Sequence, residues 1–248
     1  MAFESTQPAS VAANASAREF MVGRASDETL DSTAGGTRLS SLSPSLMADL
    51  QRFGAEPGAS TLDMLAMLAA TVRHGRSLRA MVQVEQHVVP ITLFPTQRVA
   101  HSPLPMISLL AGRVQDWRLQ QVAPAQLSAP GAAELQAKSH NFTPLPLLLW
   151  AVAQRGSRDT LLPEIAGTVA YRVTPSADLR MLDLTGTVLA AVERLRRHTT
   201  NLRDITSWPG FDKARAQRLL NGLYLQAALL VSRTHPAATN DGWAHANH

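Results

Sequence analysis

The residues of this 248-residue chain that are best suited to chemistry are basic side chains near its C-terminal end. The segment from Thr185 to Arg233 holds eight basic and three acidic residues, a net charge of +5, whereas the whole chain carries +4. The eight are Arg194, Arg196, Arg197, Arg203, Lys213, Arg215, Arg218 and Arg233. All of the net positive charge therefore lies in one segment. Its basic side chains are suited to contact phosphates, an acidic protein surface or water alone.

Motifs for catalysis and metal binding are not found in the sequence. It has no P-loop, no G-x-G-x-x-G, no G-x-S-x-G and no H-E-x-x-H. Because it has no cysteine, disulfides and thiolate metal sites are excluded. His245 and His248 fall in a polar tail, and His87 and His101 flank predicted strands, so all four read as ordinary surface or edge residues. We expect a non-enzymatic protein with no catalytic residue, no metal, no cofactor and no identified small-molecule substrate.

The same sequence argues against membrane insertion and secretion. No run of about 18 apolar residues occurs, and the N-terminal residues contain no apolar core of a signal peptide. With no cysteine in the chain, a reducing cytoplasm is the expected location.

Apolar spacing predicts three helices in the basic segment. Val188, Leu189, Val192 and Leu195 form one stripe, with Thr185 or Thr187 as the cap. A second, shorter helix ends at Trp208, where Pro209-Gly210 predicts a sharp turn. A third helix follows a cap at Asp212, and Leu229–Val231 is typical of a strand.

The third helix presents two sides when it is projected at 100° per residue. Leu219, Leu220 and Leu223 fall on one side, which we expect to be buried together with Val192 and Trp208. The opposite side is predicted to bind a partner through Arg215, Arg218, Asn221, Gly222 and Leu225. A glycine and a leucine on a nominally polar side indicate that something packs closely there.

This segment resembles a known family. An apolar helix is followed by Asn201-Leu202-Arg203-Asp204-Ile205, by Gly210-Phe211-Asp212, and by Leu219-Leu220-Asn221-Gly222-Leu223-Tyr224 before the final strand. The pattern, over residues 145–235, is similar to the winged-helix-like C-terminal module of bacterial PatA-like signalling proteins. The resemblance implies a non-enzymatic regulatory role in signalling, surface motility or development.

Two functional hypotheses follow. In the first, the chain is a regulatory adaptor that contacts a protein partner or a second copy of itself. In the alternative, it is a transcriptional regulator that binds DNA through a helix-turn-helix at residues 201–227. The DNA hypothesis assigns phosphate contacts to Arg203, Lys213, Arg215 and Arg218, and base contacts to Arg218 and Asn221. We favour the adaptor, because Gly222 and Leu225 are unusual on a groove-facing helix and no second basic wing is evident.

The predicted fold class is α+β, with a small α+β domain followed by a mainly helical, winged-helix-like domain. Strands are expected at Leu78–Gln86, Val88–Phe94, Gln97–Ala100, Trp117–Val122 and Ile165–Val173. A helix beginning near Ser60 or Thr61, with one of them as the cap, is expected to precede them. The predicted divisions are a disordered Ser/Ala/Thr-rich arm (1–42), the α+β domain (58–126), a linker (127–142), the winged-helix-like domain (143–235) and a flexible tail (236–248).

Overall fold

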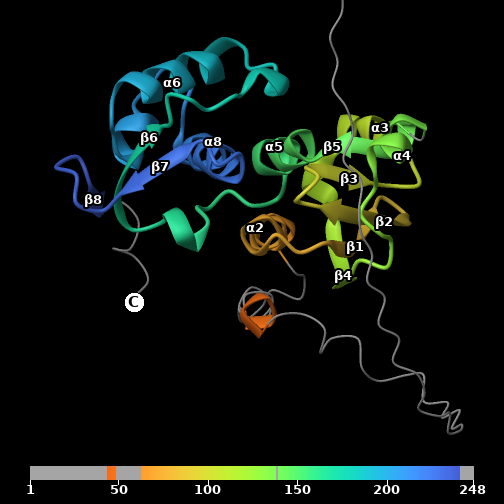
Figure 1. Ribbon diagram of the computed structural model, residues 1–248. Coiled ribbons are helices and arrows are strands. Elements are labelled where there is room, and N and C mark those ends of the chain that lie inside the picture. The colour runs from red at the N-terminus through yellow and green to blue at the C-terminus, as the bar shows by residue number, and fades with distance from the viewer. Residues whose placement is uncertain (1–43, 49–62, 138, 241–248) are drawn as a thin grey trace, which may run out of the picture. The chain divides into compact units, whose positions relative to one another are not determined.

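The computed structural model describes residues 44–48, 63–137 and 139–240 (Figure 1). The predicted arm, residues 1–42, lies outside this range, and so do residues 241–248 of the predicted tail. The described residues combine helices with two antiparallel sheets, which confirms the α+β class.

The larger sheet has five antiparallel strands in the order β4-β1-β2-β3-β5. They are β1 (Leu78–Val84), β2 (His87–Phe94), β3 (Val99–His101), β4 (Arg118–Pro124) and β5 (Phe142–Pro144). In β1 the side chains of Leu78, Ala80 and Val82 are buried and alternate with less buried ones, which is the period of a strand with one face on a core. The strands predicted around β1 to β4 are confirmed.

The helix α2 (Met64–His74) begins one residue after Asp63. The Asp63 carboxylate accepts hydrogen bonds from the amides of Leu65 and Ala66, at 2.9 and 3.3 Å, so it is the N-cap. Ser60 and Thr61, the predicted caps, lie outside the described residues. Arg158 forms an ion pair with the same carboxylate and thereby ties the start of α2 to a segment 95 residues further along the chain.

The prediction of a mainly helical C-terminal region is wrong. Its elements are α5 (Leu145–Arg155), β6 (Thr168–Val173), α6 (Gly186–Arg197), α7 (Leu202–Thr206), α8 (Lys213–Leu225), β7 (Leu229–Ser232) and β8 (Thr239–Asn240). The three strands form a second sheet in the order β7-β6-β8, and irregular segments separate the helices. Since β7 and β8 each pair with β6 on opposite sides, they do not form the hairpin that makes a wing.

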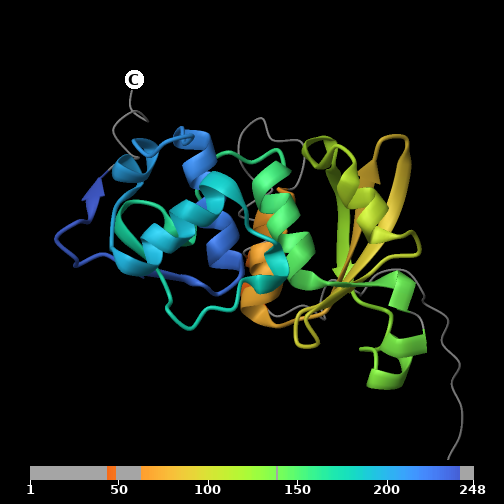
Figure 2. The ribbon, with the colours of Figure 1, turned by 90° about the horizontal axis from the view of Figure 1, so that it is seen from above.

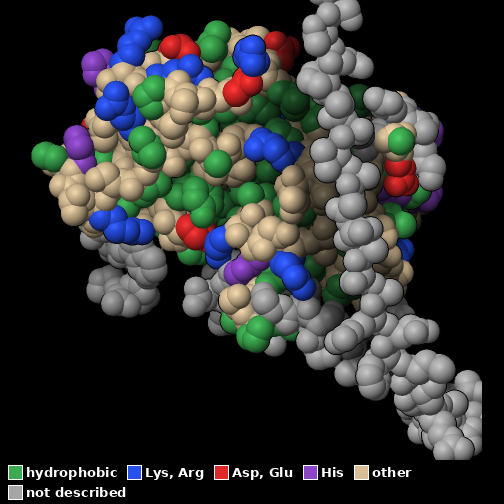
Figure 3. All heavy atoms as spheres, viewed as in Figure 1, with side chains coloured by type: hydrophobic (Ala, Val, Ile, Leu, Met, Phe, Trp, Pro, Cys, Tyr) green, Lys and Arg blue, Asp and Glu red, His purple; other side chains and the backbone are tan. Residues whose placement is uncertain are grey.

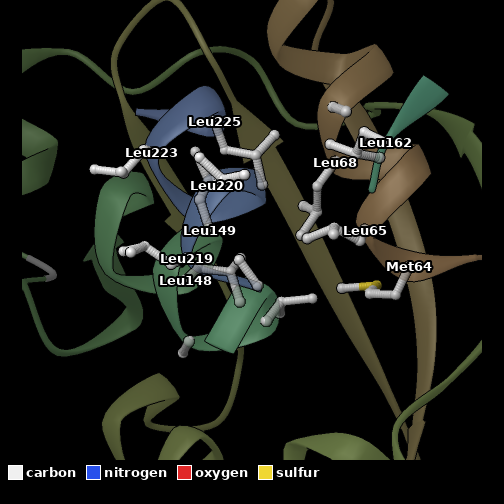
Figure 4. Close-up of a cluster of buried hydrophobic side chains, with 14 of the residues drawn as sticks. Met64, Leu65, Leu68, Leu148, Leu149, Leu162, Leu219, Leu220, Leu223 and Leu225 are labelled. Atoms are coloured by element: carbon white, nitrogen blue, oxygen red, sulfur yellow. The ribbon is translucent and has the colours of Figure 1, made fainter. Parts of the chain in front are cut away.

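A single hydrophobic core joins the two predicted domains across the predicted linker. It includes Ile91 of the large sheet, Leu149 of α5 and Leu220 of α8, each 3% exposed or less. Figure 2 shows α5 and α2 between the five-stranded sheet and α8. Helix α5 contacts both α2 and α8. Figure 4 shows leucines from α2, α5 and α8 gathered in this core. The expected burial of Leu219, Leu220, Leu223, Val192 and Trp208 is confirmed.

The helices α5 and α8 pack closely where they cross. A Cβ atom at Gly222 would lie only 2.7 Å from Cζ3 of Trp150 and 2.9 Å from Nε2 of Gln154. Two side-chain amides join the helices on either side of this point: Gln154 donates to the Arg218 carbonyl at 2.9 Å, and Gln226 donates to the Pro146 carbonyl at 3.0 Å. Only a glycine allows the two helices to pack at this distance.

We predict that Gly222→Ala destabilises the protein. Alanine is favoured over glycine in a helix by about 1 kcal/mol, but a methyl group forced against the Trp150 ring costs about 1–3 kcal/mol. The expected net loss is about 0–2 kcal/mol in the free energy of unfolding, measured by urea denaturation. Gly131→Ala is the matched control, because nothing lies within 4 Å of a Cβ there. A Gly222→Ala protein more stable than the wild type would contradict the close approach.

The core of α8 gives a second expectation. Leu220 is fully buried, so Leu220→Ala should lower the free energy of unfolding by about 2–5 kcal/mol. Leu230, on β7, is 51% exposed and serves as the control, for which Leu230→Ala should cost far less. Equal effects of the two substitutions in denaturant melts would show that α8 packs differently.

Candidate functional site

The helix α6 presents one side to the core and the other to solvent. Ala191, Val192 and Leu195 are buried, whereas Thr187 and Arg194, which lie two turns apart, are exposed. Thr185, one of the two predicted caps, occupies the N-cap position, but its side chain makes no capping hydrogen bond. Arg194, Arg196 and Arg197 occupy the last turn, where the helix dipole favours positive charge.

The turn between α7 and α8 packs against the exposed side of α6. Asn201 caps α7 by accepting from the Asp204 amide at 2.8 Å, and Asp212 caps α8 by accepting from the Arg215 amide at 2.7 Å. Gly210 has a φ of 77°, and a Cβ there would lie 3.1 Å from Cγ2 of Thr187. The predicted Pro209-Gly210 turn is therefore confirmed, and glycine is required both for the backbone conformation and for the contact with α6.

Two arginines lie over two aromatic rings of this turn. The guanidinium carbon of Arg194 lies 4.6 Å from the centre of the Trp208 ring, and that of Arg215 lies 5.3 Å from the centre of Phe211. The two rings meet edge to face with centres 6.3 Å apart. This arrangement is a pair of cation–π contacts on one continuous aromatic base. We call the surface formed by Thr187, Arg194, Trp208, Phe211 and Arg215 the arginine face.

Hydrogen bonds also fix Arg215 within the arginine face. Its Nη1 donates to the Gly210 carbonyl at 2.8 Å, and its Nη2 donates to Oγ1 of Thr187 at 2.9 Å. The side chain thus bridges α6 and the α7–α8 turn while it remains exposed. An arginine held in one orientation loses less conformational entropy when it binds a partner.

Charge on this side of the molecule is mixed but mainly basic. Figure 3 shows several Lys and Arg side chains over α6, with acidic side chains among them. Asp212 caps α8, and Glu193 lies 3.7 Å from Nε of Arg196. Since these acids are already engaged within the chain, the arginine face suits a negatively charged partner.

Only one of the five predicted partner-binding residues lies on this surface. Arg215 is exposed and Arg218 is partly buried, but Asn221, Gly222 and Leu225 are buried. Gly222 faces Trp150 of α5, and Asn221 donates to the Thr160 carbonyl and accepts from the Leu162 amide, both at 2.9 Å. The close packing expected on this side of the helix comes from the same chain, so these three residues are not available to a partner in this structure.

The four residues predicted to contact phosphate are likewise divided between exposed and partly buried positions. Arg203, Lys213 and Arg215 are exposed, on α7 and the first turn of α8. Arg218 is different, because its Nε is buried without a hydrogen-bond partner among the described residues. Asn221, a predicted base contact, is 0% exposed. The described structure therefore exposes only one end of α8.

Sequence reasoning missed the pairing of arginines with aromatic rings. The sequence identifies Arg194 only as one of the basic residues and Trp208 only as part of the core, where it is 7% exposed and lies beneath the Arg194 guanidinium. The available signal was Phe211 directly after Pro209-Gly210, an apolar ring in a turn four residues before Arg215. The partner of Arg194 is 14 residues away, and no local spacing rule identifies it.

Other chemistry on the described surface is limited. Within residues 44–48, 63–137 and 139–240 there is no group of three or more His, Asp or Glu residues that could hold a metal ion. No helix in the described part of the chain is long and apolar enough to cross a bilayer. Hydrogen bonds from Arg180 hold the pKa of the exposed Asp178 carboxyl well below its usual range, so this carboxylate stays ionised near neutral pH.

The chain matches no protein-family model, no curated protein and no solved structure. The resemblance to PatA-like proteins therefore stays a prediction.

Asn221 offers a test of whether the far side of α8 is structural. We expect Asn221→Ala to lower the free energy of unfolding by about 1–3 kcal/mol, because the buried Leu162 amide loses its acceptor. The measurement is a denaturant melt together with hydrogen exchange of the Leu162 amide, which should lose protection. Unchanged stability and unchanged exchange would mean that Asn221 is free for another role.

Proposed function

We propose that the protein is a non-enzymatic regulatory adaptor that recognises a protein partner through the arginine face. The observation that carries the proposal is the pair of exposed arginines stacked on Trp208 and Phe211. Arginine and aromatic side chains are enriched among the residues that dominate protein–protein binding energy. The resemblance of residues 145–235 to PatA-like proteins supports a bacterial signalling system as the setting.

The covering of α8 favours this function over DNA binding. A recognition helix must present three or four side chains to base edges along one exposed side. In this protein one side of α8 carries the core leucines, and the other carries Asn221, Gly222 and Leu225 against the same chain. The exposed cations Arg203, Lys213 and Arg215 would give a log–log salt slope of about −2.7 if each met one phosphate, which is typical of weak, sequence-independent binding.

Photocrosslinking in cells that naturally contain the protein tests the proposal. A photoreactive amino acid at Ala190, which is exposed on α6 one turn from both Thr187 and Arg194, should crosslink a defined protein. The same group at Gln120, exposed on β4, is the control and should not crosslink that protein. Replacing both Arg194 and Arg215 by alanine should weaken binding of the purified partner at least tenfold, about 1.4 kcal/mol.

A second measurement separates the adaptor from the DNA-binding alternative. Selection from a random DNA pool at about 150 mM salt should enrich no defined site, since phosphate contacts alone fade at that ionic strength. Enrichment of one sequence would overturn the adaptor proposal, above all if Lys213→Ala or Arg203→Ala weakened it. The absence of any Ala190 crosslink above the Gln120 background would contradict the proposal as well.

A further inference from the structure

The strand β7 forms an edge of the smaller sheet. It pairs with β6 on one side only, because the strand order of this sheet is β7-β6-β8 (Figure 1). Its residues, Leu229–Ser232, include no charged residue and no proline, and the side chain of Leu230 is 51% exposed. An unprotected edge of this kind can pair with a strand of another chain.

The other edges of the two sheets are better protected. The strand β4 begins with Arg118 and ends with Pro124, and its register with β1 shifts once along its length. The strand β5 is three residues long and ends with Pro144, and β8 consists of Thr239 and Asn240. Charge, proline, irregular register and short length all discourage pairing at an edge. In the part of the chain that the structure describes, β7 is the edge that lacks charge and proline and exposes a leucine.

The ladder between β6 and β7 determines which backbone groups of β7 face outward. The Thr174 amide donates to the Ala228 carbonyl at 2.8 Å, and these two residues continue the register of the paired strands. Hydrogen-bonded and non-hydrogen-bonded pairs alternate along an antiparallel ladder. Leu230 therefore bonds to β6, whereas the N–H and C=O groups of Leu229 and Val231 point away from β6.

The hydrogen bonds of β6 agree with this alternation. Tyr171 lies opposite Val231, but its amide and carbonyl both bond to Thr200, at 2.7 and 3.0 Å, and not to β7. Among the described residues, no backbone group bonds to the outward groups of Leu229 and Val231. The edge therefore offers two donors and two acceptors to a further strand.

These outward groups are complementary to a second copy of themselves. When two β7 strands meet antiparallel about a two-fold axis at Leu230, Leu229 of each copy lies opposite Val231 of the other. Each of these two pairs then exchanges two hydrogen bonds. The two Leu230 residues form the non-hydrogen-bonded pair on the axis, where Cα atoms come within about 4.5 Å, so the exposed leucines cover each other. Arg233 falls opposite Ala227, so no like charges meet.

Only this register uses the whole edge. A shift by one residue sets outward groups against inward ones. One further step in one direction sets Val231 against Ala227, whose φ of 55° is not that of a strand. In the other direction it sets Leu229 against Arg233, which lies beyond the end of β7.

We propose that the protein forms a two-fold symmetric dimer through β7, in which the smaller sheets of two copies join into one. Because β7 has only four residues, the interface is small, and the dimer is expected to be weak and to depend on concentration. The proposal goes beyond the adaptor function and does not depend on it, because no residue of β7 belongs to the arginine face.

The wild-type full chain provides the first test. Sedimentation velocity over about a hundredfold range of concentration should show the mean mass rising from that of a monomer toward that of a dimer. Hydrogen exchange should show the Leu229 and Val231 amides gaining protection with the fraction of dimer, whereas the Leu230 amide is protected throughout. A monomer up to the limit of solubility would overturn the proposal. A dimer that leaves the Leu229 and Val231 amides unprotected would overturn it as well.

Two variants test the edge itself. Leu230→Lys sets like charges opposite each other on the axis and should raise the dissociation constant about tenfold or more. Val231→Pro removes an outward N–H without removing a donor to β6 and should have the same effect. Val88→Lys, at a valine that is 53% exposed on β2, is the matched control and should leave dimerisation unchanged. The proposal fails if Leu230→Lys dimerises as the wild type does, or if Val88→Lys weakens the dimer as much.

Discussion

The packing of α5 on α8 is the contact on which the rest of this structure depends. It requires a glycine at position 222, because the Trp150 ring occupies the space of any side chain there. The amides of Gln154 and Gln226 reinforce the contact on both sides of the crossing. Since α5 also packs on α2 and on strands β3 and β5, this one crossing connects the five-stranded sheet with the C-terminal helices.

The same crossing decides which parts of the basic segment reach solvent. With its leucines in the core and its other side against α5 and the segment 160–162, α8 exposes little beyond its first turn. The sequence alone assigns positive charge to the whole of α8. In the structure the exposed positive charge of α8 is concentrated at its first turn, at Lys213 and Arg215, beside the exposed side of α6. The fold thereby places the arginine face beside the start of α8.

Much of the fold follows from local sequence patterns. Hydrophobic period, helix capping and turn chemistry act over only a few residues, so one sequence is enough to predict their results. These results are the strands β1, β2 and β4, the cap at Asp212, the Pro209-Gly210 turn and the buried leucines of α8. The pairing of β6 with β7 and β8 does not follow from local patterns, because nothing in a single sequence shows which strands pair when they lie some 60 residues apart. That pairing is why the C-terminal region is not mainly helical.

The candidate site was harder to predict for a related reason. A helix projection assigns Arg218, Asn221 and Leu225 to a polar side, and it assumes that such a side meets water. In this protein α5 is apolar nearly all round, so it needs neighbours on more than one side, and α8 supplies one of them. Asn221 shows the consequence: a polar residue that seemed suited to reading a base instead satisfies two backbone groups of its own chain.

The physical form of the arginine face bears on the kind of partner that it suits. Sequence-independent binding to a phosphate backbone depends on the number of positive charges that meet phosphates, and it does not require side chains held in one orientation. Arg194 and Arg215 are instead stacked on rings, and Arg215 is also hydrogen-bonded to Gly210 and Thr187. Stacking on Trp208 leaves the edge of the Arg194 guanidinium to donate hydrogen bonds, whereas Arg215 already donates from Nη1 and Nη2 within the chain and is thereby fixed. Fixed donors over an apolar base match a surface that combines carboxylates with apolar contacts, and that combination is found on proteins rather than on a phosphate chain.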